Sequence, residues 1–371
     1  MSKSLIAFAL LLCLPTVGWA DELARVFRFG KAKTQHSDFW EGRIQHASWI
    51  DDEWVVFFSE GKVRCLSTKS GEIRWTLDIY EENVGEKVER TFPQKFDGLF
   101  DWNVSKSSKR LVIQDRSQQI KVIDCTTGTV LFQPTDEQLA EILGLRFVVV
   151  GRVLLSPTDG RLIFESAEST FGRHGYVLDS TYSKLEGTFD IDANPRFISI
   201  SPDGKRIAVI AEDEVLSVRE ILENREVFFR GKRIHEAPEN RTGSIDVPFF
   251  SNICDSGGSL LVYSRDNSWG TGAVTLHDLE NDSSTTFSGR NGHIEFDVAF
   301  RSKRLVLTGT STELAVLDFN GAVLASEKHA TMYRNLSVEF SPSEDRILVG
   351  SWDNTISVFA LVKTTADCHR P

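Results

Sequence analysis

The sequence predicts an all-β fold, a single seven-bladed β-propeller of four-stranded antiparallel blades. Leu260 and Leu305 are 45 positions apart, and Leu305 and Ile347 are 42 apart, which matches the ~40–45-residue period of such blades. At this spacing the chain repeats one phrase, a basic residue followed by apolar residues: Arg110–Ile113, Arg161–Phe164, Arg206–Val209, Arg304–Leu307 and Arg346–Val349. Such self-similarity indicates one closed ring of repeats rather than two domains.

Seven units form one domain over residues 21–371. They begin near Ile44, Trp102, Arg146, Phe197, Phe249, Ile294 and Leu336. In the last unit, two β-rich runs surround the turn Trp352–Thr355, which predicts a hairpin. That unit lacks a fourth strand, and the alternating segment Leu23–Phe29 is expected to supply it and to remove an open sheet edge. Arg25 and Arg28 should then point to solvent.

Residues 1–20 have the pattern of a signal peptide. Lys3 precedes the apolar run Leu5–Leu14, and Gly18–Ala20 places small residues before a cleavage site after Ala20. The apolar run is shorter than the ~20 residues that span a bilayer, although an uncleaved N-terminal anchor stays open as an alternative. We therefore expect an exported protein, periplasmic or secreted, with no membrane span after cleavage.

The charge of the chain is acidic. The full chain has a formal net charge of −11, and cleavage after Ala20 removes Lys3 and no acidic residue. An acidic surface repels phosphate backbones, so the sequence disfavours nucleic acid as a partner. We expect a monomeric propeller.

Four cysteines remain after cleavage: Cys65, Cys125, Cys254 and Cys368. In an oxidising compartment they allow two disulfides in three connectivities, whereas the alternative is unpaired thiols buried in strands. No two cysteines have the Cys-x-x-Cys spacing of a zinc ribbon or a thioredoxin-like site.

Several blades resemble those of the WD40-repeat family. The resemblance rests on Phe340–Pro342 with Gly350–Phe359, on Ile200–Gly204 with Val215–Val218, and on Gly292–His293 with Leu317–Asp318. The segment Val63–Trp75 is instead similar to the repeats of quinoprotein propellers, in which a Gly turn and a Trp close the blade. The Trp-Asp that ends strand c in WD40 repeats is absent, and His293 is expected to be structural, like the matching histidine of the family.

No catalytic motif is present: neither a Gly-rich phosphate loop nor His-Glu-x-x-His nor Gly-x-Ser-x-Gly occurs. Acidic residues recur near the predicted turns between the second and third strands of blades, at Asp115, Asp213, Asp266 and Asp353. They either surround the channel and bind a cation or cap their own turns, which the preference of Asp for turns favours. We expect no cofactor and no metal.

The candidate binding residues lie in these same turns, on the face where propellers gather their binding loops. Alignment on Trp352 gives Ser59, Arg116, Glu212 and Thr310. Two turns look expanded: residues 165–175, with Phe171, Arg173 and His174, and residues 264–272, with Arg265 and Trp269. Long loops on a rigid scaffold are favoured places for binding residues, and aromatic residues and Arg are enriched at binding hot spots. Residues 136–143 should form a short helix on the same face.

These observations favour a non-catalytic module that binds a protein partner through its loops. The candidate contacts are Trp352, Trp269, Arg265, Arg116, Glu212, Phe171 and Arg173. The alternative is a propeller enzyme or a cofactor or metal binder of the quinoprotein or lactonase kind, which the first blade and the acidic turns would support.

Overall fold

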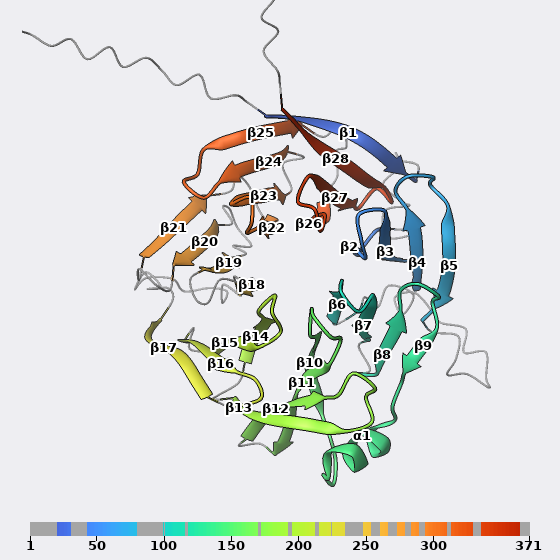
Figure 1. Cartoon of the computed structure of the whole chain (residues 1–371), viewed down its shortest axis with the longest axis vertical. Helices are drawn as coiled ribbons and strands as arrows, with labels where there is room; N and C mark the ends of the chain where they lie inside the picture. Colours follow the sequence, from blue (N-terminus) through green and yellow to red (C-terminus); the bar gives the residue numbers. More distant parts are fainter. Residues whose placement is uncertain are drawn as a thin grey trace, which may run out of the picture.

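Seven four-stranded antiparallel sheets stand around a central axis (Figure 1). This arrangement confirms the predicted fold class. The structure is a computed structural model that describes residues 21–30, 43–79, 99, 101–115, 118–169, 172–191, 195–211, 215–223, 225–233, 248–253, 260–265, 273–278, 283–288, 294–309, 313–328 and 335–363. We name the strands of each blade a to d, from the axis outward.

Six blades take their strands consecutively from the chain. Blade 1 consists of β2 (His46–Trp49), β3 (Trp54–Ser59), β4 (Lys62–Ser67) and β5 (Ile73–Asp78). Blade 2 consists of β6 (Asp101–Ser105), β7 (Arg110–Gln114), β8 (Ile120–Asp124) and β9 (Val130–Phe132). Blade 3 consists of β10 (Val150–Leu155), β11 (Leu162–Ser169), β12 (Gly172–Leu178) and β13 (Leu185–Ile191).

The next three blades repeat this order. Blade 4 consists of β14 (Pro195–Ile200), β15 (Arg206–Ala211), β16 (Val215–Glu220) and β17 (Arg225–Arg233). Blade 5 consists of β18 (Pro248–Ile253), β19 (Leu260–Arg265), β20 (Ala273–Asp278) and β21 (Ser283–Ser288). Blade 6 consists of β22 (Ile294–Ala299), β23 (Arg304–Gly309), β24 (Glu313–Asp318) and β25 (Val323–Lys328).

Blade 7 closes the ring with strands from both ends of the chain. It consists of β26 (Asn335–Phe340), β27 (Arg346–Ser351), β28 (Ile356–Lys363) and β1 (Asp21–Phe29). In Figure 1 the blue β1 lies beside the red β28. This pairing confirms that the segment from residue 23 to residue 29 completes the last blade.

The closing strand is held by backbone pairing and by one buried side chain, and the chain makes a close backbone contact directly after it. β1 pairs antiparallel with β28, with a bulge between Arg25 and Phe27, and Leu23 lies in the core of blades 6 and 7. After β1, Gly30 has φ +87°, and a Cβ there would lie 2.2 Å from the carbonyl oxygen of Asn354. Only glycine fits this close approach. Arg25 points to solvent as predicted.

In blades 2 and 7 the repeated basic residue begins strand b and ties one blade to the next. Arg110 donates to the carbonyl of Ser180 at 2.6 Å and to the hydroxyl of Tyr182 at 2.9 Å, both in the c–d turn of blade 3. Arg346 of blade 7 lies over the ring of Trp49 in blade 1, 5.3 Å from its centroid. The apolar residues that follow are continuous because strand b is covered by neighbouring blades on both faces.

The single helix within the described residues, α1 (Asp136–Leu143), confirms the predicted helix. Thr135 and Gln138 form a capping box, and Gly144 ends the helix in the left-handed region with φ 71°. No described helix is long and apolar enough to cross a bilayer.

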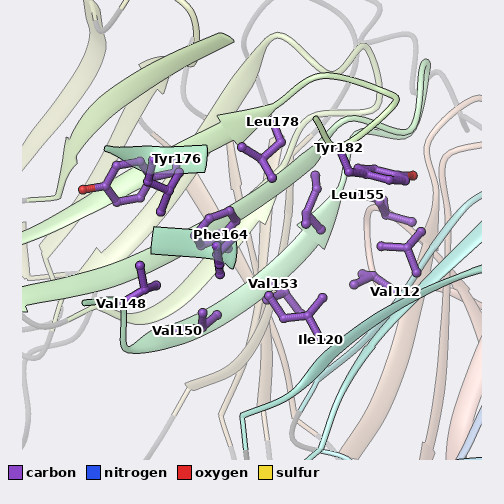
Figure 2. Close-up of a cluster of buried hydrophobic side chains, with 14 of the residues drawn as sticks. Val112, Ile120, Val148, Val150, Val153, Leu155, Phe164, Tyr176, Leu178 and Tyr182 are labelled. Atoms are coloured by element: carbon purple, nitrogen blue, oxygen red, sulfur yellow. The ribbon is translucent and has the colours of Figure 1, made fainter. Parts of the chain in front are cut away.

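The core is divided among the interfaces between blades. Figure 2 shows one such cluster between blades 2 and 3, in which Val148 and Val150 lie with Phe164 and Tyr176. Leu139 and Leu143 of α1 also belong to it. The helix is therefore attached to the ring by burial of its apolar side.

The expanded turn expected at residues 165–175 is wrong. β11 and β12 continue through this segment as a paired hairpin, with Glu165 opposite Gly175 and Ser169 opposite Gly172. Strand pairing satisfies backbone groups that a loop would leave to water. The sequence pattern missed it because Gly172 and Gly175 suggest a loop, whereas Gly175 accommodates Phe189, whose ring atoms would lie 1.9–2.3 Å from a Cβ.

Candidate interaction face and inner ring

Strand order defines two faces of the ring. Because neighbouring strands are antiparallel, the b–c turns and the d–a connections lie at one end of the blades, which we call the upper face. The a–b and c–d turns lie at the other end, the lower face. The sequence-predicted binding residues that the structure describes, Arg173, Arg265 and Trp352, lie at the upper end.

The structure describes only part of the predicted binding set. Arg116, Glu212, Trp269 and Phe171 lie outside the described residues. Arg265 is the last residue of β19, opposite Ala273, and Arg173 lies in β12 opposite Ile191. Both positions are at the upper ends of their strands, and a shared binding site with Trp352 stays a prediction.

The turn around Trp352 is tight, and its acid is buried. Trp352 is half-buried rather than fully exposed, and Asp353 is 0% exposed. One oxygen of Asp353 accepts from the backbone N–H of Thr355 at 3.1 Å and from its hydroxyl at 2.5 Å. The other oxygen lies 3.8 Å from the guanidinium of Arg28, which joins the turn to the closing strand. Arg28 is nevertheless exposed, as predicted.

Turn chemistry accounts for the two described acids at these positions. In blade 2, Asp115 accepts from the backbone N–H of Gln119 at 3.0 Å, as Asp353 does from Thr355. Both acids therefore cap their own turns, while Asp213 and Asp266 lie outside the described residues. Within the part of the chain that the structure describes, no three His, Cys, Asp or Glu side chains gather as a metal site.

Sequence reasoning missed an apolar pair on the upper face. Phe147 is 56% exposed and Val149 is 44% exposed, in the d–a connection between blades 2 and 3. They alternate with Val148 and Val150, which are buried in the interblade core. Extended backbone sends successive side chains to opposite sides, so burial of one pair forces the other into solvent. Because all four residues at 147–150 are apolar, the sequence does not show which pair is buried.

Inner strands are joined to one another by side chains at one repeated position, which we call the inner-ring position. This position on strand a lies opposite the second residue after the basic residue of strand b. It is occupied by Asn103 opposite Val112, by Asp297 opposite Val306 and by Glu339 opposite Leu348. Each accepts a backbone N–H from strand a of the next blade: Leu155 at 2.9 Å, Phe340 at 2.7 Å and Trp49 at 3.2 Å. These N–H groups belong to the free edge of strand a, so the side chains satisfy donors that strand b cannot reach.

The inner ring carries an ionic cluster at its lower end, made of Lys106, Asp297 and Glu339. Lys106 Nζ lies 2.6 Å from Glu339 Oε1. Burial and the charge of Glu339 raise the pKa of Asp297 to about 7, against the opposing effect of Lys106. Burial alone would lower the pKa of Lys106, but Glu339, Asp297 and Asp52 together raise it. The cluster joins blades 2, 6 and 7 around the channel.

A half-buried histidine lies on strand a of blade 1. His46 stacks on Trp102 of blade 2, with ring centroids 5.6 Å apart and an angle of 11° between the planes. Burial, followed by the charge of Arg43, lowers the pKa of His46 to about 4. His46 is therefore neutral at neutral pH and serves as a packing residue between blades.

The two described cavities open on the lower face, between neighbouring blades. One of about 580 Å³ is lined by Asp159, Arg161, Ser180, Lys184, Leu185, Glu186 and Leu222. The other, of about 450 Å³, is lined by Arg301, Ser302, Arg304, Ser343, Glu344, Asp345 and Leu361. Neither contains a residue that the sequence singled out for binding.

The junction of blades 1 and 2 contains a Trp packed on a Gly turn and two buried cysteines, and both features were considered in the sequence analysis. Trp75 donates its indole N–H to the carbonyl of Cys125 at 2.9 Å and covers Gly128, whose φ is +78°. A Gly turn and a Trp thus close the junction of these blades. Cys65 and Cys125 are both buried free thiols. The expectation of unpaired buried thiols therefore holds for these two, and the expectation of two disulfides does not. Cys254 and Cys368 lie outside the described residues.

Comparison with protein-family models and with curated proteins found no match. The repeated antiparallel sheets are those of propeller blades.

Proposed function

We propose that this chain is an exported, WD40-like propeller that binds a protein partner through its upper face, without catalysis. The observation that carries the proposal is the exposure of Phe147. Among the side chains that the structure describes, it is the one aromatic exposed over more than half of its surface. Exposed aromatic residues are enriched at protein interfaces because they bury a large area at a small entropic cost.

Phe147 is held in place from both sides. α1 precedes it with a capped start and a defined end, and three residues of the helix, Leu139, Ala140 and Leu143, are buried. Val148 and Val150 attach the following residues to the core. A partner would therefore meet a presented ring rather than a side chain that must first be ordered, which lowers the entropic cost of binding.

Apart from Val149, other exposed apolar side chains lie elsewhere. Ile73, Leu131 and Val323 are exposed on outer strands β5, β9 and β25, at the side of the ring. Isolated apolar residues on a surface are normal and need no partner. They provide matched controls for a test of the upper face.

Variants test this proposal by co-purification. The tagged mature chain is expressed in its own host with Phe147→Ser, with Trp352→Ala or with the control Leu131→Ser. We expect a stoichiometric protein to co-purify with the unchanged chain and the control and to be reduced at least tenfold with Phe147→Ser, a change of about 1.4 kcal/mol or more. Equal recovery with Phe147→Ser and Leu131→Ser would contradict the proposal.

A further inference from the structure

The segment between α1 and β10, residues 146–149, carries backbone groups that the fold does not use, and we call it the edge segment. Before it, the N–H of Leu145 donates to the carbonyl of Ala140 at 2.9 Å and completes the helix end. After it, the carbonyl of Val150 accepts from the side chain of Gln114 at 3.3 Å. Within the described residues, no hydrogen bond uses a backbone N–H or C=O of the four residues in between.

The edge segment is nevertheless fixed in place by its buried side. Val148 lies in the core cluster between blades 2 and 3, and Val150 follows it into the same cluster. Figure 2 shows both side chains on the side of Phe164. Phe147 and Val149 are exposed on the opposite side. The backbone therefore stands at the surface in a preformed, extended shape, which lowers the entropic cost of binding to it.

Each edge of such a segment offers donors and acceptors to a neighbouring strand. In extended backbone the N–H and C=O of one residue point to one edge, and those of the next residue point to the other edge. Phe147 and Val149 thus share one edge, and Arg146 and Val148 share the other. Side chains stand roughly perpendicular to these edges, so an added strand would bond to the backbone beside the exposed Phe147 and Val149.

We propose that the protein partner binds by strand addition, with an extended peptide segment paired to one edge of residues 146–149. This inference rests on the proposed function, in which the partner meets Phe147. Main-chain hydrogen bonds supply affinity in this mode, and alternate side chains supply specificity. Apolar residues at alternate positions of the peptide suit cross-strand contacts with Phe147 and Val149.

Charge adds a second element of recognition. Arg146 begins the edge segment, is exposed, and has no ion pair within the described part of the chain. An acidic residue in the peptide complements it. The occupant is therefore an extended segment with alternating apolar residues and an acid near one end.

The backbone distinguishes strand addition from other ways of covering Phe147. A helix that packs on Phe147 contacts side chains and leaves the amides of the edge segment to water. A paired strand takes up the amides of alternate residues and slows their exchange with solvent. Hydrogen exchange at residues 146–149 is thus the deciding observable.

A selected peptide serves as the probe. The immobilised mature chain selects from a displayed library of peptides of about nine residues, a common strand length, and Phe147→Ser chain removes peptides that bind elsewhere. The selected peptide is synthesised, and residue-resolved amide exchange of the mature chain is measured with and without it. We expect exchange to slow at least about tenfold at one edge, either Phe147 and Val149 or Arg146 and Val148.

Proline variants test the same edge by affinity. Val149→Pro removes a donor from one edge and Arg146→Pro removes one from the other, and neither donor has a partner in the fold. Val149→Ala and Arg146→Ala are the matched controls, since they lose the side chain and keep the N–H. We expect one proline variant to weaken peptide binding at least about threefold more than its alanine control, while the other matches its control. Melting temperatures check that each ring is intact.

Three results would overturn strand addition. The first is that no selected peptide prefers the wild-type chain to Phe147→Ser. The second is a peptide that binds through Phe147 and slows no amide of the edge segment, which needs no variant to fold. The third is a wild-type chain that dimerises where Phe147→Ser does not, because the edge would then belong to a second copy. Co-purification with Phe147→Ser and Leu131→Ser decides the proposed function separately, so the two failures are distinguishable.

Discussion

Glu339 in the last blade accepts the backbone N–H of Trp49 in the first blade at 3.2 Å, across 290 residues of sequence. The indole N–H of Trp49 in turn donates to the backbone carbonyl of Glu339, also at 3.2 Å. The junction at which the ring closes is therefore secured at its inner strands as well as by β1 at its outer edge.

Glu339→Ala should destabilise the ring, because it leaves the Trp49 N–H without its acceptor. The cost of an unsatisfied buried donor is roughly 1–3 kcal/mol. Glu339→Gln keeps an acceptor and should cost less, which separates the hydrogen bond from the ion pair with Lys106. Urea unfolding of the three chains measures both differences, and equal stability of the Ala and Gln variants would contradict this account.

Gly128→Ala should be more damaging than Gly144→Ala. Both glycines have positive φ, +78° and +71°, but an added Cβ would lie 2.7 Å from the ring of Trp75 at residue 128 and would meet nothing within 4 Å at residue 144. The backbone strain of roughly 1–2 kcal/mol is common to both, and the clash adds roughly 1–3 kcal/mol at Gly128.

Thermal or urea unfolding of these two glycine variants measures the difference. A second variant, Trp75→Leu combined with Gly128→Ala, should recover part of the loss. If Gly144→Ala proves the more destabilising of the two, the packing of Trp75 on Gly128 is wrong.

His46 should make the ring sensitive to acid. Its pKa is lowered to about 4 in the folded chain, against about 6.5 when unfolded. Stability from neutral His46 is thus present above about pH 6.5 and is lost as the pH falls towards about 4. His46→Phe, which can still stack on Trp102, should show a weaker decline in melting temperature over that range; an unchanged decline would refute this assignment.

The thiols of Cys65 and Cys125 should be unreactive in the native ring. Both side chains are 0% exposed, and burial raises the pKa of Cys65 to about 12 and that of Cys125 further. The thiolate is the reactive form, so a thiol reagent at neutral pH should label neither until the chain unfolds. Mature protein with Cys254→Ser and Cys368→Ser isolates the two, and rapid native labelling would count against their burial.

Local pattern was enough to predict the blades. The basic residue and the apolar run mark strand b because that strand is buried on both sides, and the acids Asp136 and Glu137 mark the start of α1. The strand Leu23–Phe29 was predictable because a ring with one missing strand has an open edge.

The inner ring could not be predicted in the same way. Asn103, Asp297 and Glu339 differ in type, and their acceptors lie in the next blade, so no local spacing connects Glu339 with Trp49. Exposure of Phe147 depends on which side of one extended segment faces the core, which tertiary packing decides. The burial of Asp353 likewise depends on β1, more than 300 positions away.

Site-specific photocrosslinking tests the proposed binding face most directly. A photoreactive phenylalanine analogue replaces Phe147 in one chain and Val323, on the side of the ring, in another, and both are irradiated in their own host. We expect one protein to be crosslinked from position 147 and not from position 323. Crosslinking of the same protein from position 323 with none from 147 would contradict the upper-face account.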